Sequence, residues 1–561
     1  MSESNETHPP DHHSEPPARP RWPGLLVALL LVAWLFPGTL GRDPWKADEG
    51  YTFGLVLHIL QTGDWVIPTL AGEPFMQKPP LLFNLSALSA RLFASFLPPH
   101  DGARGSVLLF NLITLIALGL TARRCWGAGR GWLAPVLFIG APGLIHTQHM
   151  MITDVALVTG FAVAQWGLVL SREHPLGGGF LAGTGVGIAF MAKGLLGPGL
   201  IGVTVALLPV WFKSWRNLDY LRLLLALGLA FLPWAILWPA LVYQRSPDLF
   251  VEWFWNQNVA RFIGQSTVID SKNNLLFCLR TVSWFALPAL PLALWGWWDR
   301  RKRGGLAPAD QITLVLFATM CVVFSISRQA RTIYASPMVV PVALAGVAMV
   351  DRLPPRWARR SNLGLTVLFG VAVAAAWIGW ILMVTGIVPL LNEQLASLVP
   401  DYTPRLEWIL FVAALIPTAG FAVWLRRQDR SSGRVTVLNW AAGLLLVYTL
   451  GMTLFLPVAN GRMTYRQVFV PLRDHLPPAG EVVASYGVGE SERALLHYLA
   501  GLKTRRVEVF PEVIEQADWV LIQGDHRRNE RMGPPEPGEW TLRFEGRRSR
   551  SESYRLYERV N

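Results

Sequence analysis

Three observations predict an α-helical polytopic membrane protein. Of 561 residues, 52% are hydrophobic and only 16% are charged, whereas soluble domains carry roughly a quarter charged residues. Nearly uncharged runs of about 20 residues, the length that crosses a hydrocarbon core, recur along the chain. Lys and Arg gather in the short loops between these runs. Because a bilayer offers no water to the backbone, the runs are expected to be helices.

Counting the apolar runs gives about thirteen crossings. They lie near 22–40, 105–122, 131–148, 154–170, 178–192, 195–212, 221–243, 274–298, 311–326, 335–350, 362–386, 406–425 and 435–457. The cationic loops are Arg123-Arg124 with Arg130, Lys213 with Arg216, Arg300 to Arg303, Arg356 with Arg359-Arg360, and Arg426-Arg427. If these loops face the cytoplasm, the N-terminus is cytoplasmic and the C-terminus lies outside.

The run from Leu81 to Leu97 is apolar, but counting it as a crossing would invert the orientation of every later loop. It also carries polar residues, namely Asn84, Ser86, Ser89 and Arg91. We therefore expect a juxtamembrane amphipathic helix against the outer, periplasmic face.

Composition divides the chain into three parts. Residues 1–21 are rich in Pro, His, Glu and Ser and predict a disordered cytoplasmic tail. Residues 22–457 form the transmembrane part, with a first extracytoplasmic loop at 41–104. Residues 458–561 predict a small extracytoplasmic α/β domain, with strands at 481–487, 517–524 and 539–546 and a helix at 491–501. Its Glu490, Glu492, His497 and His526 are expected at the surface.

The net charge of +12 follows from the cytoplasmic loops, so we expect membrane lipids as partners and no nucleic acid. The three cysteines, Cys125, Cys278 and Cys321, lie in or beside apolar runs and indicate neither a disulfide framework nor a metal cluster.

The predicted topology brings several ionisable groups to the outer face. They are the adjacent acids Asp48-Glu49, Lys78 before two prolines, Asp154, Lys193, and Arg261 in the loop 253–264. Charged residues at membrane depth are costly and usually face a cavity or a partner. Three of these features have simpler alternatives. Residues 47–80 could be an ordinary polar loop, Asp154 could cap a helix, and the Lys193 side chain could reach to the membrane interface. Their convergence on one face favours a site for an anionic lipid substrate.

In order along the chain, the motifs DEGY, GDWVIPTLAGEPFMQKPPLLF, ITDVAL, AKG and FWNQNVARFIG resemble those of bacterial polyprenyl-phosphate-dependent glycosyltransferases. These enzymes belong to the glycosyltransferase-C superfamily and include lipid A aminoarabinose transferases and protein O-mannosyltransferases. The resemblance covers about residues 22–350, and the run from Gly63 to Pro80 is its most specific part.

The resemblance implies an inverting transfer of a sugar from a polyprenyl (undecaprenyl) phosphate to lipid A, another glycan or a protein. Asp48, beside Glu49, would act on the acceptor group as general base or position it, and Asp154 would support the site. The candidates for binding the donor phosphate are Lys78, Lys193, Arg261, Arg331 and Tyr334. An ordinary surface loop is the alternative for the last two.

The pocket residues Tyr51, Gln77, Gln257 and Asn258 include departures from the family. Aminoarabinose transferases usually have Glu where this chain has Gln77, and a Glu-His pair where it has Gln257-Asn258. Amides are poor zinc ligands. We therefore expect no metal and no cofactor, with a divalent metal left open, and do not carry over the donor sugar.

A transporter or flippase of a lipid-linked glycan is the alternative from another class, since many spans with buried Asp and Lys would also serve it. Transporters commonly show repeated halves with sites at the midplane, whereas here the polar groups lie at span ends. A scaffold with an exterior binding domain leaves the 48–80 loop unexplained. Either way, the expected location is the bacterial inner membrane.

Overall fold

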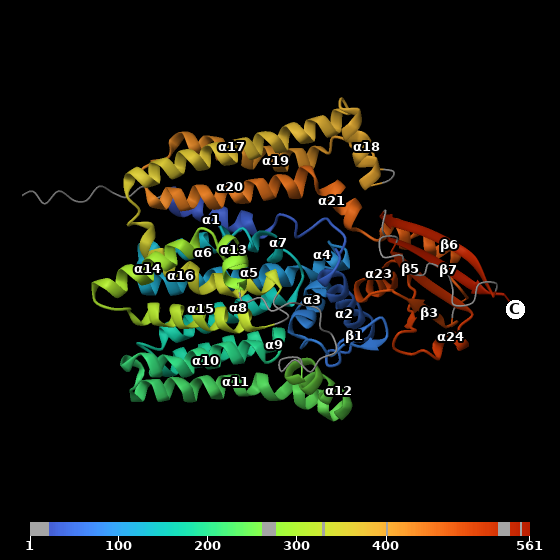
Figure 1. Ribbon diagram of the computed structural model, residues 1–561, viewed down its shortest axis with the longest axis horizontal. Helices are drawn as coiled ribbons and strands as arrows, with labels where there is room; N and C mark the ends of the chain where they lie inside the picture. The colour runs from blue at the N-terminus through green and yellow to red at the C-terminus, as the bar shows by residue number, and fades with distance from the viewer. Residues whose placement is uncertain are drawn as a thin grey trace, which may run out of the picture.

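A computed structural model describes residues 22–260, 276–327, 331–399, 402–478, 480–525, 539–549 and 552–560. It shows a bundle of long helices with a small β-sheet at one end (Figure 1). Short helices from the first loop, α2, α3 and α4, lie between the bundle and the sheet (Figure 1).

The apolar helices of the bundle are α1 (Trp22–Leu35), α5 (Gly105–Trp126), α6 (Leu133–Ile139), α8 (Thr153–Leu170), α9 (Pro175–Lys193), α10 (Leu196–Trp211), α11 (Leu218–Arg245), α13 (Ser283–Phe285), α14 (Ala289–Arg303), α15 (Pro308–Ile326), α16 (Val339–Val350), α17 (Pro355–Thr385), α19 (Trp408–Arg427) and α20 (Gly433–Leu454). Shorter helices are α2 (Asp48–Thr62), α3 (Leu81–Leu92), α4 (Pro99–Ala103), α7 (Leu144–Thr147), α12 (Pro247–Val251), α18 (Pro389–Leu398), α21 (Leu456–Met463) and α22 (Arg466–Phe469). Two π-helical segments are η3 (Glu252–Ala260) and η4 (Cys278–Val282), and a 3₁₀ segment, η5 (Thr332–Met338), precedes α16.

The prediction of a mostly helical membrane protein is confirmed. In the described ranges, nine helices are long and apolar enough to cross a membrane, or up to ten if the pair formed by residues 278–285 and α14, bent by 105°, is one span. The remaining predicted runs coincide with the shorter helices α1, α6 and α10. The helix α3 has 12 residues and buries one face, including Leu82, Phe83 and Ala87, as expected of an amphipathic helix.

Helices α8 and α9 pack closely because small residues line their contact. A Cβ added at Gly167 would lie 2.3 Å from the backbone nitrogen of Ala182, and one at Gly185 would lie 2.3 Å from that of Ala164. Such contacts let helix backbones approach closely within a membrane. Because the two helices form a hairpin, the start of α8 lies beside the end of α9, which places Asp154 next to Lys193.

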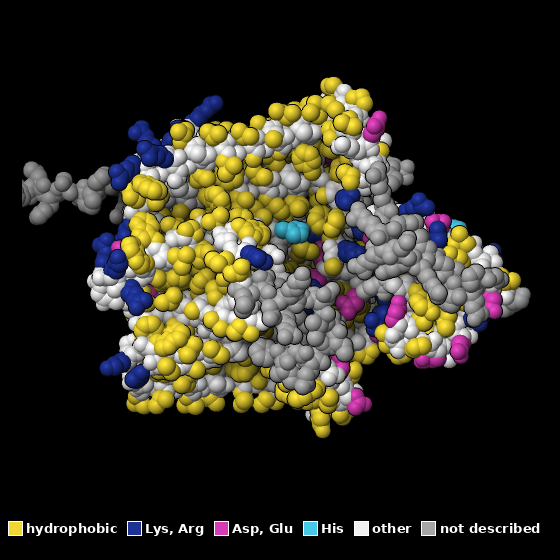
Figure 2. Space-filling model, in the orientation of Figure 1, with side chains coloured by type: hydrophobic (Ala, Val, Ile, Leu, Met, Phe, Trp, Pro, Cys, Tyr) yellow, Lys and Arg dark blue, Asp and Glu magenta, His cyan; other side chains and the backbone are white. Residues whose placement is uncertain are grey.

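Lys and Arg side chains gather at the left end of the bundle, opposite the sheet (Figures 1 and 2). Basic residues occupy the last turns of α5, α14 and α19. Asp351, after α16, accepts from Arg130 and from Arg434 at the start of α20. The cationic loops thus meet at one end, as the charge distribution predicts.

The C-terminal region forms a five-stranded sheet in the order β4-β3-β5-β7-β6. Its elements are β3 (Val483–Tyr486), α23 (Glu490–Ala500), β4 (Arg505–Arg506), α24 (Val513–Gln516), β5 (Trp519–Asp525), β6 (Trp540–Ser549) and β7 (Glu552–Arg559). The pairs β3–β4 and β3–β5 are parallel, while β7 pairs antiparallel with β5 and β6. The three predicted strands and the predicted helix are present, whereas β4 and β7 were not predicted.

Candidate active site

The first turn of α2 is fixed by a buried ion-pair cluster around Glu49. Arg104 Nε donates to Glu49 Oε1 at 2.9 Å and Arg42 Nη2 at 3.0 Å, while Arg42 Nη1 donates to Oε2. The backbone N–H groups of Trp45 and Met151 also donate to this carboxylate. Burial raises the pKa of Glu49, but the two guanidinium groups outweigh it and hold the pKa well below its usual range.

The catalytic role predicted for Glu49 needs correction. Its side chain is 0% exposed and its oxygens are already occupied by buried donors. A substrate therefore has no access to this carboxylate. Glu49 is a structural residue that anchors the start of α2 and so sets the position of its neighbour, Asp48.

Asp48 is the first residue of α2 and is half-buried, so it is not enclosed as Glu49 is. One turn further along the same helix lies Tyr51, which is buried. The Lys78 ammonium donates to the Tyr51 hydroxyl and lies 5.1 Å from the centre of its ring. Burial and then the carboxylates of Asp48, Asp154 and Glu490 raise the pKa of Tyr51 well above its usual value, so the hydroxyl stays protonated.

Asp154 and Lys193 form an ion pair, with Lys193 Nζ 2.5 Å from Asp154 Oδ1. The ammonium also lies 4.2 Å from the centre of the Tyr334 ring in η5. Ile152, not Asp154, occupies the N-cap position of α8, so the capping alternative is wrong. Lys193 turns inward to its partner, with 14% of its side chain exposed, so the alternative of reaching to the interface is wrong as well.

The amides of the predicted pocket have defined partners. Gln77 Nε2 donates to Glu490 Oε1 at 2.8 Å. Asn258 Oδ1 accepts from the backbone N–H of Leu195 at 3.1 Å, which joins η3 to the turn that follows Lys193. Gln257 Nε2 donates to Glu252 Oε1 within η3.

Of the other predicted phosphate ligands, Arg331 is exposed immediately before η5. Arg261 lies outside the described residues, as does His526.

The donor atoms around Asp48 do not suit a zinc ion. Within the described ranges, no three His, Cys, Asp or Glu side chains come together as a metal-binding group. Gln77 and Asn258, at the positions that depart from the family, present amides engaged in hydrogen bonds. The expectation of a site without metal or cofactor stays a prediction.

Sequence reasoning missed Glu490 at this site. Glu490 and Glu492 were expected at the surface, which is wrong for both. Glu490 is half-buried against Gln77, and Glu492 is buried, pairing with Lys46. Nothing in the sequence signals this arrangement, because the two segments are separated by more than 400 residues.

Two glycines of α2 lie in the contact with helix α23. A Cβ added at Gly54 would lie 2.5 Å from Ala494 Cβ, and one at Gly50 would lie 3.0 Å from Ser491 Oγ. Since these glycines are four residues apart, they lie on one face of α2. This close contact sets the position of α23, and with it that of Glu490.

We expect Gly54→Val to loosen this contact, because the added side chain has no room and overpacking costs about 1–3 kcal/mol. Limited proteolysis of the purified full chain should then cleave the C-terminal region several-fold faster. Gly364→Val is the matched control, since Gly364 has open space around its Cβ position. Equal protease resistance of the two variants would contradict this account of the interface.

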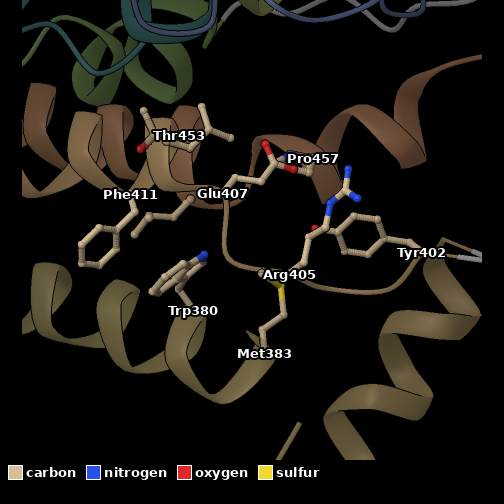
Figure 3. A pocket seen from close by; sticks show the side chains of 10 residues that line it. Trp380, Met383, Tyr402, Arg405, Glu407, Phe411, Thr453 and Pro457 are labelled. Atoms are coloured by element: carbon tan, nitrogen blue, oxygen red, sulfur yellow. The ribbon is translucent and has the colours of Figure 1, made fainter. Parts of the chain in front are cut away.

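A separate shallow hollow lies between α17, α19 and α20 (Figure 3). Its lining combines aromatic side chains, Trp380 and Phe411, with the polar side chains of Tyr402, Arg405 and Glu407. Aromatic residues beside charged ones are typical of the membrane–water interface. The hollow is built from other elements than the charged group around Asp48.

Comparison with known proteins shows what this chain resembles. The chain matches no family-wide sequence profile. It is 29% identical over 464 residues to the undecaprenyl phosphate-α-4-amino-4-deoxy-L-arabinose arabinosyl transferase of Pseudomonas aeruginosa strain UCBPP-PA14, covering 77% of this chain and 75% of that protein. It is 28% identical over 404 residues to the corresponding transferase 2 of Pseudomonas fluorescens strain Pf0-1, covering 69% of this chain and 70% of that one.

The fold agrees with these relatives. The crystal structure of ArnT from Cupriavidus metallidurans bound to undecaprenyl phosphate superposes with a TM-score of 0.70 at 18% identity, covering 95% of this chain and 98% of that one. This chain therefore shares the fold of that structure and resembles the aminoarabinose transferases in sequence. Because the superposition covers 95% of the chain, the shared fold extends into the C-terminal region as well as the bundle.

Proposed function

We propose that this chain is an inverting glycosyltransferase that moves a sugar from polyprenyl (undecaprenyl) phosphate to an acceptor, which is lipid A, another glycan or a protein. The observation that carries the proposal is the half-buried acid Asp48 in the first turn of α2, one turn before Tyr51, whose hydroxyl accepts from Lys78. The named relatives transfer 4-amino-4-deoxy-L-arabinose from undecaprenyl phosphate, and the protein that shares the fold was crystallised with undecaprenyl phosphate.

Asp48 takes the proton from the acceptor hydroxyl as its oxygen attacks the anomeric carbon and the carrier phosphate leaves. The leaving phosphate needs cations to hold its growing charge. The charge of Lys193 is already neutralised by Asp154, whereas Lys78 donates a hydrogen bond to a neutral hydroxyl. Lys78 is therefore the first ligand of the phosphate, and Lys193 with Asp154 supports it. Arg261, Arg331 and Tyr334 complete the head-group contacts.

The donor sugar need not be the one that the relatives use. Gln77, Gln257 and Asn258 replace charged residues usual in aminoarabinose transferases with neutral amides, so the charge of the pocket differs. Gln77 and Asn258 are held by the described contacts with Glu490 and Leu195. We propose that the site works without a metal or other cofactor.

In the membrane, we propose about thirteen crossings, with the tail 1–21 in the cytoplasm and the transmembrane part at 22–457. The loop 41–104 and the domain 458–561 lie on the outer face of the bacterial inner membrane. The clustering of cations at the end opposite the sheet supports this orientation. It places Asp48, Lys78 and Asp154 on the outer side.

The proposal is tested with membranes that contain the full chain and a panel of undecaprenyl phosphate-linked radiolabelled sugars, including 4-amino-4-deoxy-L-arabinose. We expect label to appear in lipid A, glycan or protein fractions. Accumulation of intact lipid-linked sugar across sealed vesicles, without transfer to any fraction, would instead indicate a transporter or flippase.

Lys78→Met should weaken binding of undecaprenyl phosphate to the purified protein about 10- to 100-fold, because a hydrogen bond to a charged group contributes about 1.5–3 kcal/mol. Lys213→Met is the control, since it removes the same charge from an exposed position in a loop at the other end of the bundle. Calorimetric titration measures both affinities. Equal affinity of the two variants would remove Lys78 from the phosphate site.

A further inference from the structure

The C-terminal region places a carboxylate beside the proposed transfer site. Glu490 is the first residue of α23, and its Oε1 accepts from Gln77 Nε2 at 2.8 Å. Gln77 is the residue immediately before Lys78. A residue from the last fifth of the chain thus contacts the motif that supplies the phosphate-binding lysine.

Several buried contacts hold α23 in this position. One turn after Glu490, Arg493 Nη2 pairs with Glu73 Oε1 at 2.7 Å, and Arg506 Nη2 pairs with Oε2 of the same carboxylate at 2.6 Å. The side chain of Arg493 is 2% exposed. With the Gly50 and Gly54 contacts, these pairs fix the helix on the first loop. The Glu490 carboxylate is therefore held in place by the fold.

The charges around Glu490 are those of the proposed site. Burial raises the pKa of Glu490, the Gln77 hydrogen bond and the charges of Arg506 and Lys78 lower it, and the Asp48 carboxylate raises it. Glu490 therefore lies within electrostatic range of the proposed base and the proposed phosphate ligand. It also accepts a hydrogen bond from Gln77, the residue before Lys78, whose ammonium donates to Tyr51.

We propose that Glu490 is a positioning residue of the transfer site. Its carboxylate holds the Gln77 amide and, through it, the orientation of Lys78 on Tyr51, so that the C-terminal domain completes the site begun by the first loop. This inference rests on the proposed glycosyl transfer and deepens it. Glu490 contacts neither the phosphate nor the acceptor. It affects turnover by fixing the positions of Gln77 and Lys78.

The proposal predicts an uncommon combination of effects for Glu490→Gln. The charge-assisted hydrogen bond from Gln77 becomes a neutral one, and the new amide can also turn its NH2 group toward Gln77, so Lys78 is held less firmly. Turnover at saturating donor should fall about ten- to a hundredfold, since a small misplacement of a phosphate ligand is costly. Affinity for undecaprenyl phosphate should change only a few-fold, because Lys78 keeps Tyr51 as its partner and the removal of a nearby anion offsets its looser position. A general loss of structure would weaken both together.

The experiment uses the purified full chain and compares Glu490→Gln with Glu512→Gln, which makes the same change at an exposed position of the same domain. The reciprocal variant Gln77→Glu/Glu490→Gln exchanges acid and amide across the hydrogen bond. We expect Gln77→Glu alone to reduce turnover, because two carboxylates then meet, and the reciprocal variant to recover most of it. Thermal unfolding of each variant is measured alongside.

Two results would overturn the proposal: turnover of Glu490→Gln equal to that of Glu512→Gln, or a reciprocal variant no better than the poorer single variant. A Glu490→Gln protein with a lower unfolding temperature and an affinity for undecaprenyl phosphate reduced as much as its turnover would likewise overturn it in favour of a purely structural contact. Failure of the proposed function looks different, because the unaltered chain itself would then transfer no sugar from any donor of the panel.

Discussion

Asp48→Asn is expected to reduce sugar transfer by about 10²- to 10⁴-fold, the usual contribution of a general base. Asparagine has nearly the same shape, but its amide cannot take the proton of the acceptor hydroxyl. The half-buried Asp48 side chain stands at the start of a helix turn that Glu49 anchors separately, so the variant should fold normally. Its affinity for undecaprenyl phosphate should stay within a few-fold of that of the unaltered protein, because Lys78 still has Tyr51 as its partner.

The measurement is the initial rate of label transfer at saturating donor, with calorimetric titration of undecaprenyl phosphate as the second readout. Asp219→Asn is the matched control, because Asp219 is 58% exposed in a surface pair with Arg222. We expect it to transfer at the normal rate. An Asp48→Asn protein that keeps more than a tenth of the normal rate would show that Asp48 is not the base.

The long helices could be predicted because hydropathy and loop charge carry their signal directly. The breaks within these helices could not be predicted. The run 131–148 is two helices, α6 and α7, separated around Pro142, and the run 274–298 bends by 105° before α14, where Pro288 stands. Proline interrupts the helix hydrogen bonds, but tertiary packing decides whether a given proline bends or breaks a membrane helix.

The candidate site was predictable only in part. The pairing of Asp154 with Lys193 follows from the hairpin of α8 and α9, which loop charge and span order predict. The sequence does not tell which of Asp48 and Glu49 lies at the site and which is buried, because both are acids. Neighbours on a helix point about 100° apart, so one faces the site and the other faces Arg42 and Arg104. The position of Glu490 depends on the docking of α23, a long-range contact without a local pattern.

Glu49→Gln is expected to lower the free energy of unfolding by about 3–5 kcal/mol, the cost of breaking a buried ion pair from one side. The substitution leaves the Arg42 guanidinium, 2% exposed, without its counter-charge, and leaves the Arg104 guanidinium, 0% exposed, with Asp101 alone. The first turn of α2 should loosen, and Asp48 with it, so transfer should fall too. Denaturant titration in detergent micelles, followed by circular dichroism, measures the change.

Glu173→Gln is the matched control, since Glu173 is 63% exposed in its pair with Arg124 and such surface pairs contribute about 0–1 kcal/mol. Acid gives an independent check. The pKa of Glu49 lies below its usual value in the folded protein, so the stability that it contributes is complete above the unfolded value near 4.5 and is lost as the pH falls below it. The gap in stability between the unaltered protein and Glu49→Gln should therefore shrink below about pH 4.5. A gap that stays constant down to pH 3, or a Glu49→Gln protein as stable as Glu173→Gln, would show that this buried cluster does not anchor α2.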